Sequence, residues 1–181
     1  MPVSTAARAA ARAGAEGSWE QVAKLATNRA ILDVSAVFET EPRKVVWILV
    51  DYEREPSVTV RHFMDPDVAL VLCEAILLGT FPRDFPKGFT EYKGTPRPDG
   101  PPEARVLSIW YDPQKQYRYG LKIERGVGEV IGAGAVKMVE RQEAVTFVAT
   151  EFDMRRLAVQ LRDYIRDARL IERMARRFTI L

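Results

Sequence analysis

The sequence predicts an α+β fold built as a pseudo-duplicated pair of ββββα units, with antiparallel sheets and two main helices. Segments rich in Val, Ile and aromatic residues alternate with polar turns, as strands do. Two longer segments carry apolar residues at helical spacing. The passage from a Val-Thr strand through phenylalanine into a helix also occurs twice, at VTVRHF–MDPDVALVLCEAI and AVTFVATEF–DMRRLAVQLRDYI. The two helices align Val68 with Leu157, Leu72 with Leu161 and Ile76 with Ile165.

Composition places limits on the class of protein. The 181 residues are 47% hydrophobic and 29% charged, which suits one integrated domain with a proper core. A net charge of +2 means that any basic surface must come from local clustering. A single cysteine, Cys73, excludes an internal disulfide and fits a reducing compartment. No apolar run reaches the roughly 18 residues of a membrane span. We therefore expect a cytoplasmic protein with no membrane partner.

Residues 1–30 are expected to form an N-terminal tail and a short helix. The Arg, Ser and Ala content of the start loosely resembles an organellar transit peptide, but a frayed Ala-rich tail is the reading we favour. Ser18 is placed to cap a helix over SWEQVAKLATNRA.

Residues 31–79 are expected to form the first β-rich unit and a buried helix. ILDVSAVFE, KVVWILVDY and SVTVRHF have strand composition, and one further strand could precede them. Asp65 then stands at an N-cap position, Pro66 at the first helical position and Gly79 just past the helix end. The intervening VALVLCEAILL is apolar on nearly every side, so Cys73 is expected to be a small core residue.

Residues 80–103 carry six prolines and are expected to form a linker. The aromatic residues in FPRDFPKGFTEYK lie among Arg83, Lys87 and Lys93. These rings could stack on bases as a clasp, but anchoring the loop to the core is the interpretation we favour.

Residues 104–181 are expected to form the second ββββα unit. ARVLSIWYD and QYRYGLKIER form a hairpin around a turn at 112–115, and AVKMVER and AVTFVAT form another around a turn near Gln142. Between them GVGEVIGAG is expected to be a flexible β-loop. It is no dinucleotide loop, because Ile131 replaces a required glycine and a strand follows. A helix over about 153–177 ends the unit.

The element order over roughly residues 30–176 resembles the Whirly and PUR families of single-stranded DNA and RNA binders. The resemblance implies a sheet whose open face stacks bases, with helices that support the core or an oligomer interface. The lysine-rich KGKAAL segment of Whirly proteins has no counterpart here, so no binding residue is carried over from that family.

The first hairpin combines aromatic and basic residues, which together suit stacking on bases and neutralising phosphates. A four-residue loop would place Trp110 opposite Tyr117 and Ser108 opposite Tyr119; another loop length would re-sort the two faces. The alternative is that these rings pack under the helix. The predicted nucleic-acid-binding residues are Trp110, Tyr111, Lys115, Tyr117, Arg118, Tyr119, Lys122, Arg125 and Lys137.

The C-terminal helix carries a stripe of arginines: Arg155, Arg162, Arg166, Arg169, Arg173 and Arg177. The stripe could bind phosphates, but solvated arginines paired with nearby acids are the more common arrangement. The apolar residues Phe178, Ile180 and Leu181 suggest a contact with a second subunit, so we expect a homo-oligomer.

These patterns predict a protein that binds single-stranded DNA or RNA with little sequence preference and without a cofactor. No catalytic or metal-ligand spacing is found, and the sole histidine, His62, has no Cys or Ser partner nearby in the sequence. We therefore expect a non-enzyme. The alternatives are an assembly subunit that uses the sheet and the C-terminal helix, and an enzyme built from carboxylates that lie far apart in the sequence.

Overall fold

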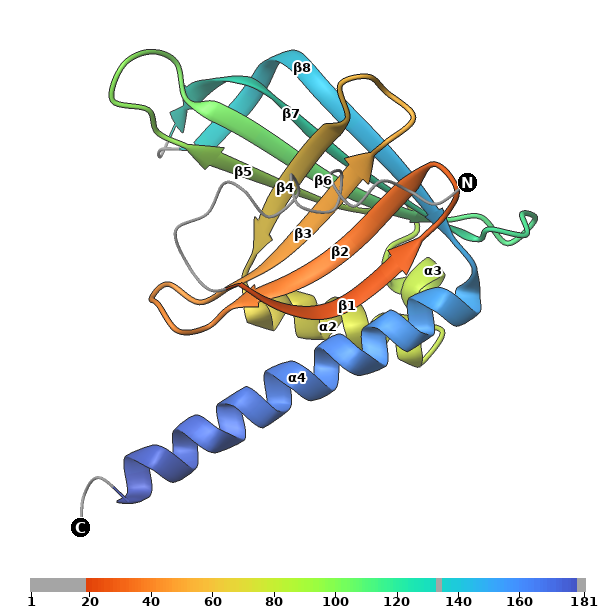
Figure 1. The fold of residues 1–181 in the computed structure, drawn as a ribbon, viewed down its shortest axis with the longest axis vertical. Coiled ribbons are helices and arrows are strands. Elements are labelled where there is room, and N and C mark those ends of the chain that lie inside the picture. Colours follow the sequence, from red (N-terminus) through yellow and green to blue (C-terminus); the bar gives the residue numbers. More distant parts are fainter. Residues whose placement is uncertain (1–18, 133–134, 179–181) are drawn as a thin grey trace.

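The computed structural model describes residues 19–132 and 135–178, and it confirms the predicted α+β class (Figure 1). Each of two antiparallel four-stranded sheets is followed by a long helix. The first sheet contains β1 (Glu20–Ala26), β2 (Ala30–Val37), β3 (Lys44–Asp51) and β4 (Val58–Met64), in that order. The second contains β5 (Phe89–Thr95), β6 (Glu103–Tyr111), β7 (Tyr119–Ile131) and β8 (Ala135–Ala149). The helices are α2 (Pro66–Leu77), the short α3 (Phe81–Asp84) and α4 (Glu151–Phe178).

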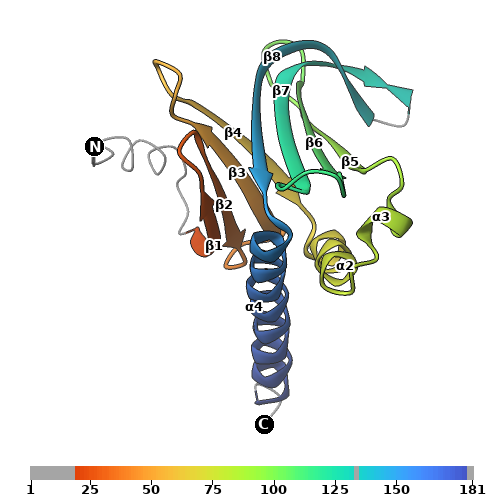
Figure 2. The ribbon, with the colours of Figure 1, turned by 90° about the vertical axis from the view of Figure 1, so that its right-hand side faces the viewer.

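The core lies between the two sheets and is closed at one end by α2 and α4 (Figure 2). Trp47 of β3, Leu107 of β6 and Leu121 of β7 point into it and are buried. Leu72 of α2 and Leu161 of α4 complete it from the helical end. The main hydrophobic cluster joins both ββββα units, so the interior between the sheets is shared by the two units.

The boundaries of α2 follow the predicted signals. Asp65 stands at the N-cap, Pro66 opens the helix, and Gly79 takes a φ of +69° just beyond its end. The Thr80 N–H donates to the Ala75 carbonyl at 2.9 Å and the Gly79 N–H to the Ile76 carbonyl at 3.2 Å, which is the Schellman pattern. The helix therefore ends where glycine can adopt a left-handed conformation.

The predicted helix within residues 18–30 is wrong, because residues 20–26 form β1. Ala23 and Leu25 face the core, and β1 pairs with β2 through a bulge between Gln21 and Ala23. The bulge breaks the alternation of period two, and Gln, Ala and Lys favour helix locally. Pairing with β2 overrides that local preference. The predicted tail and Ser18 lie outside the described residues.

The predicted linker at 80–103 is wrong in part, because it contains α3 and β5. β5 pairs with β6 and supplies the fourth strand of the second sheet. The Phe81 ring is buried and lies 5.1 Å from Phe85, which in turn lies 5.6 Å from Phe89. These three rings anchor the segment to the core, as the favoured interpretation held. Tyr92 lies on the outer face of β5 and is 65% exposed.

The predicted turn near Gln142 is also wrong, because β8 is one strand of 15 residues. Arg125 pairs with Glu143 and Gly126 with Arg141, so Gln142 is the extra residue of a β-bulge. A polar bulge on an edge strand resembles a turn in the sequence. The glycine-rich segment is not simply a loop either, since β7 continues through it to Ile131; residues 133–134 lie outside the described part.

The free edge of β4 crosses the inner face of the second sheet. His62 points inward from β4 and meets Glu91 of β5, with Nε2 and Oε2 2.7 Å apart. Just before β4, Arg54 donates to the Ala144 carbonyl of β8 at 3.3 Å. Beyond the β4 edge, the inner face of the second sheet carries Lys93, Arg105 and Arg125 in place of apolar core residues. That boundary positions the candidate site.

Candidate nucleic-acid interface

The hairpin register differs from the predicted one. Tyr111 pairs with Tyr119 and Trp110 with Gly120, so the loop runs over residues 112–118. The predicted pairing of Trp110 with Tyr117 is therefore wrong, and the two predicted faces are re-sorted. Core-facing residues now include Leu107, Ile109, Tyr111, Tyr119, Leu121 and Ile123.

Two of the predicted tyrosines belong to the core side of the sheet. Tyr119 is buried, and its ring lies 5.5 Å from Phe81 and 5.0 Å from Tyr111. Burial raises the pKa of Tyr119 to about 12. Tyr111 is half-buried against it. For these two residues the packing alternative is the one that the structure supports.

The other predicted residues are scattered. Trp110 and Lys122 lie on the outer face of the second sheet, where the Trp110 indole covers Gly120. Tyr117, Lys115 and Arg118 occupy the exposed loop. Arg118 donates to Glu151 at 2.6 Å and Lys122 lies 3.2 Å from Glu124. Lys137 lies near the far end of the β7–β8 hairpin. The structure therefore does not bring the predicted set together, and Arg125 alone among them belongs to the cluster described next.

Three cations stand side by side on the inner face of the second sheet. Lys93 of β5 is directly opposite Arg105 of β6, and Arg105 is directly opposite Arg125 of β7. Like charges directly opposite each other destabilise a sheet. One rung closer to the core, Leu107 and Ile123 occupy the same two strands and are buried. The row therefore begins where the apolar core ends.

Carboxylates partly offset this row. Arg125 lies 2.7 Å from Glu143, which continues the row on β8. Arg105 and Arg97 both contact Glu103. Lys93 lies 3.1 Å from both Asp65 and Glu91. In the described chain, these ion pairs link five cations, Lys44, Lys93, Arg97, Arg105 and Arg125, to four carboxylates, Asp65, Glu91, Glu103 and Glu143.

Two aromatic rings stand beside the cation row at the β4 edge. Phe63 of β4 and Trp19 meet edge to face, with centroids 6.0 Å apart. The Arg105 guanidinium lies 5.4 Å from the Phe63 centroid, and that of Arg61 lies 5.7 Å from the Trp19 centroid. Both rings also pack on buried β3 residues of the outer face, which hold them in place. We call this surface the basic-aromatic seam and define it as Trp19, Arg61, Phe63, Lys93, Arg105 and Arg125.

The arginines of the seam, Arg61, Arg105 and Arg125, have buried Nε atoms without a hydrogen-bond partner among the described residues. Arg61 also forms no ion pair with a described carboxylate, and its guanidinium lies over the Trp19 ring. A ligand cannot reach these buried Nε atoms, so a phosphate would have to contact the terminal guanidinium nitrogens of the arginines. Burial, aided by Arg125 and Arg97, lowers the pKa of Arg105 although Glu103 opposes the shift.

His62 forms a buried polar pair behind the seam. Burial lowers its pKa even though the hydrogen bond to Glu91 opposes that shift. Burial alone would raise the pKa of Glu91, but hydrogen bonds from His62 and Lys93 outweigh it and leave the pKa lowered. A neutral His62 therefore donates from Nε2 to an ionised Glu91, which in turn contacts Lys93. This chain of contacts fixes Lys93 at the end of the cation row.

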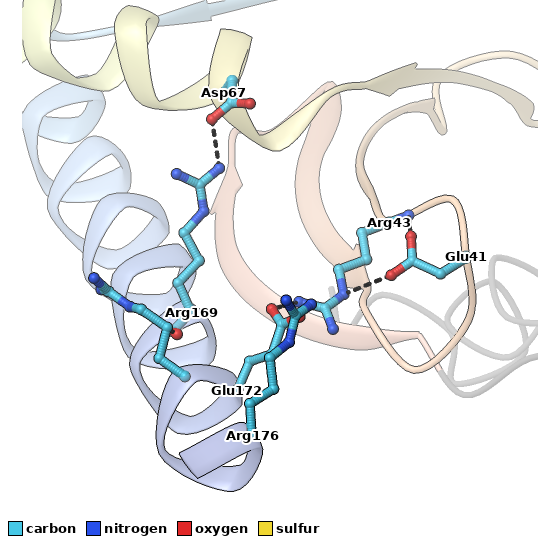
Figure 3. Close-up of polar contacts among 7 residues, drawn as sticks. Glu41, Arg43, Asp67, Arg169, Glu172 and Arg176 are labelled. Atoms are coloured by element: carbon cyan, nitrogen blue, oxygen red, sulfur yellow. Dashed lines mark hydrogen bonds and ion pairs between the residues drawn. The ribbon is translucent and has the colours of Figure 1, made fainter. Parts of the chain in front are cut away.

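Four of the six arginines of the stripe on α4 pair with acids, and Figure 3 shows one of these pairs, Arg169 with Asp67. Arg166 reaches Glu74 at 2.7 Å and Arg169 reaches Asp67 at 2.5 Å, both on α2. Farther along, Glu172 is contacted by Arg43 and Arg176. These pairs support the alternative in which the stripe arginines pair with nearby acids.

The seam was missed because it depends on strand register. Arg105 and Arg125 lie 20 positions apart in the sequence, and Lys93 lies in the segment expected to be a linker. One local signal was available: Arg61 and Phe63 alternate with the inward residues of β4, so both had to share the outer face.

A comparison of the sequence with models of known protein families, and a second with curated proteins, finds no match. Within the described chain, no helix combines the length and hydropathy needed to cross a bilayer. Those same residues contain no group of three or more His, Cys, Asp or Glu side chains placed to hold a metal ion.

Proposed function

We propose that this chain binds single-stranded nucleic acid along the basic-aromatic seam, as a cytoplasmic protein that needs no cofactor. The observation that carries the proposal is the row of Lys93, Arg105 and Arg125 beside the Trp19 and Phe63 rings. A row of directly opposed cations lowers the stability of the sheet. Such departures from good local packing are expected at functional sites, where a ligand of opposite charge offsets them.

The arrangement suits a single strand better than a duplex. Neighbouring strands lie about 4.8 Å apart, so the three cations span roughly 10 Å and match a short stretch of phosphate backbone. The flanking rings can stack only on bases that are not already stacked within a helix. Of the arginines of α4 that a duplex groove could contact, Arg166 and Arg169 are instead engaged with α2.

The same chemistry predicts weak sequence preference. Arginine and lysine contacts to phosphate carry no sequence information, and every base offers a π-face to an aromatic ring. The seam combines these two kinds of contact. We therefore expect DNA and RNA strands of mixed sequence to bind with similar affinity.

A fluorescence-anisotropy titration with labelled single-stranded and duplex oligonucleotides tests the proposal. We expect tighter binding to the single strand, with the logarithm of affinity falling linearly against the logarithm of salt by about 0.7 per neutralised phosphate. Equal affinity for the two forms, or no binding at low salt, would refute it.

A further inference from the structure

Helix α4 divides into a docked half and a projecting half. Met154, Leu157, Leu161 and Ile165 are buried against the rest of the protein. Beyond them the helix extends away from both sheets (Figures 1 and 2). This projecting half carries large apolar side chains that are between 49% and 68% exposed: Leu170, Ile171, Met174 and Phe178.

The exposed apolar residues lie on a different side of α4 from its contacts with the protein body. At 3.6 residues per turn, Leu170 and Met174 lie roughly opposite the buried Ile165. The flank that carries Arg166 and Arg169 is engaged with α2. The Glu172 side is held by Arg43 from the β2–β3 loop (Figure 3). The body of the protein therefore leaves the apolar face of the projecting half uncovered.

The spacing of this face is that of a helix-packing seam. Asp167, Leu170, Met174 and Arg177 follow one another at intervals of three, four and three, as the inner positions of a coiled coil do. In this order the four residues are an acid, two apolar residues and a base, and their positions are symmetric about position 172. Neither Asp167 nor Arg177 forms an ion pair with any other described residue, although Arg166, Arg169 and Arg176 do.

We propose that a second copy of this chain packs antiparallel against α4 about a two-fold axis near residue 172. The axis would place Asp167 against Arg177 of the second copy and Leu170 against its Met174, with both contacts formed twice. Ile171 and Phe178 flank this seam. Charge complementarity selects the occupant and its direction, because a parallel partner would place Asp167 against Asp167 and Arg177 against Arg177.

The contact is small. The helix from 166 to 178 is about 20 Å long, at 1.5 Å per residue. An interface of this size lies at the low end of the range for specific association. We expect a reversible dimer that forms at micromolar concentration.

Sedimentation equilibrium on the purified full chain tests the proposal with a charge exchange. Asp167→Arg alone and Arg177→Asp alone each turn two attractive contacts into repulsive ones, so each should weaken dimerisation about tenfold. The double variant Asp167→Arg/Arg177→Asp restores both contacts and should dimerise like the original chain. An equimolar mixture of the two single variants should form a heterodimer for the same reason.

Leu170→Glu should abolish the dimer while the far-UV circular dichroism and thermal unfolding stay close to those of the original chain, since Leu170 is exposed. A monomeric original chain at high micromolar concentration would overturn the proposal. So would single charge variants that dimerise normally, because a parallel or unrelated contact would not depend on this exchange.

Discussion

Replacing Arg125 by glutamine should weaken binding of single-stranded nucleic acid with little change in protein stability. The side chain is 40% exposed, lies 2.7 Å from Glu143 and stands directly opposite Arg105. The substitution removes an attraction and a repulsion together. Loss of a half-exposed ion pair costs about 0–1 kcal/mol. Removing the repulsion between Arg125 and Arg105 across the strands stabilises the fold by about 0.2–1 kcal/mol.

These two contributions nearly cancel, so the free energy of unfolding should change by less than about 1 kcal/mol. For a chain of this size that corresponds to a shift in Tm of no more than about 4 °C. Binding behaves differently, because a charge-assisted hydrogen bond to phosphate contributes about 1.5–3 kcal/mol. We therefore expect affinity for the single strand to fall by at least about tenfold, and the salt slope to decrease by about 0.7.

Arg118→Gln is the matched control. Arg118 is 44% exposed and pairs with Glu151 at 2.6 Å, so the two arginines agree in residue type, exposure and ion pairing. They differ in position, because Arg118 lies in the hairpin loop away from the seam. Anisotropy titrations at several salt concentrations, with thermal melts of both variants, provide the comparison. Equal losses of affinity in the two variants would refute the seam as the binding surface and leave only a general effect of charge.

Two further predictions concern packing and pH. Gly120→Ala should destabilise the fold by about 1–3 kcal/mol in urea unfolding, because a Cβ at position 120 would overlap the Trp110 ring. The same variant should leave nucleic-acid affinity unchanged. A loss of affinity in the folded variant would implicate the outer face of the second sheet in binding. The lowered pKa of His62 means that the unfolded chain takes up a proton as pH falls through about 6.5 while the folded chain does not, so stability should decrease from pH 7 downward. His62→Gln should flatten that part of the urea-midpoint profile, and an unchanged profile would contradict the assignment of a neutral buried histidine.

The sequence was most informative where local chemistry decides the structure. Asp65, Pro66 and Gly79 mark the ends of α2 through capping and φ preference, and the structure places them as predicted. Cys73 is buried, and burial raises its pKa to about 12, as suits a small core residue. The sequence led to wrong predictions where pairing with another strand decides the secondary structure. β1 is a strand because β2 lies beside it, and its bulge conceals the alternation.

The binding surface depended on register more than on composition. Aromatic and basic residues were recognised in the hairpin, but a loop of seven residues, in place of four, moved Tyr119 into the core and left Trp110 on the outer face. Arg125 was among the predicted binding residues, but its position in the row of cations follows only from the register between β6 and β7. Arg105 could be recognised as its neighbour only once β6 and β7 are aligned.

Ultraviolet crosslinking of the intact chain to a single-stranded oligonucleotide, followed by mass spectrometry of the attached peptides, tests the central claim most directly. If the seam is the binding surface, crosslinked residues should fall at Trp19 and Phe63 and next to Lys93, Arg105 and Arg125, and they should be depleted by Arg125→Gln. Crosslinks confined to residues 112–118 or to the arginines of α4 would contradict the seam and place the nucleic acid elsewhere on the protein.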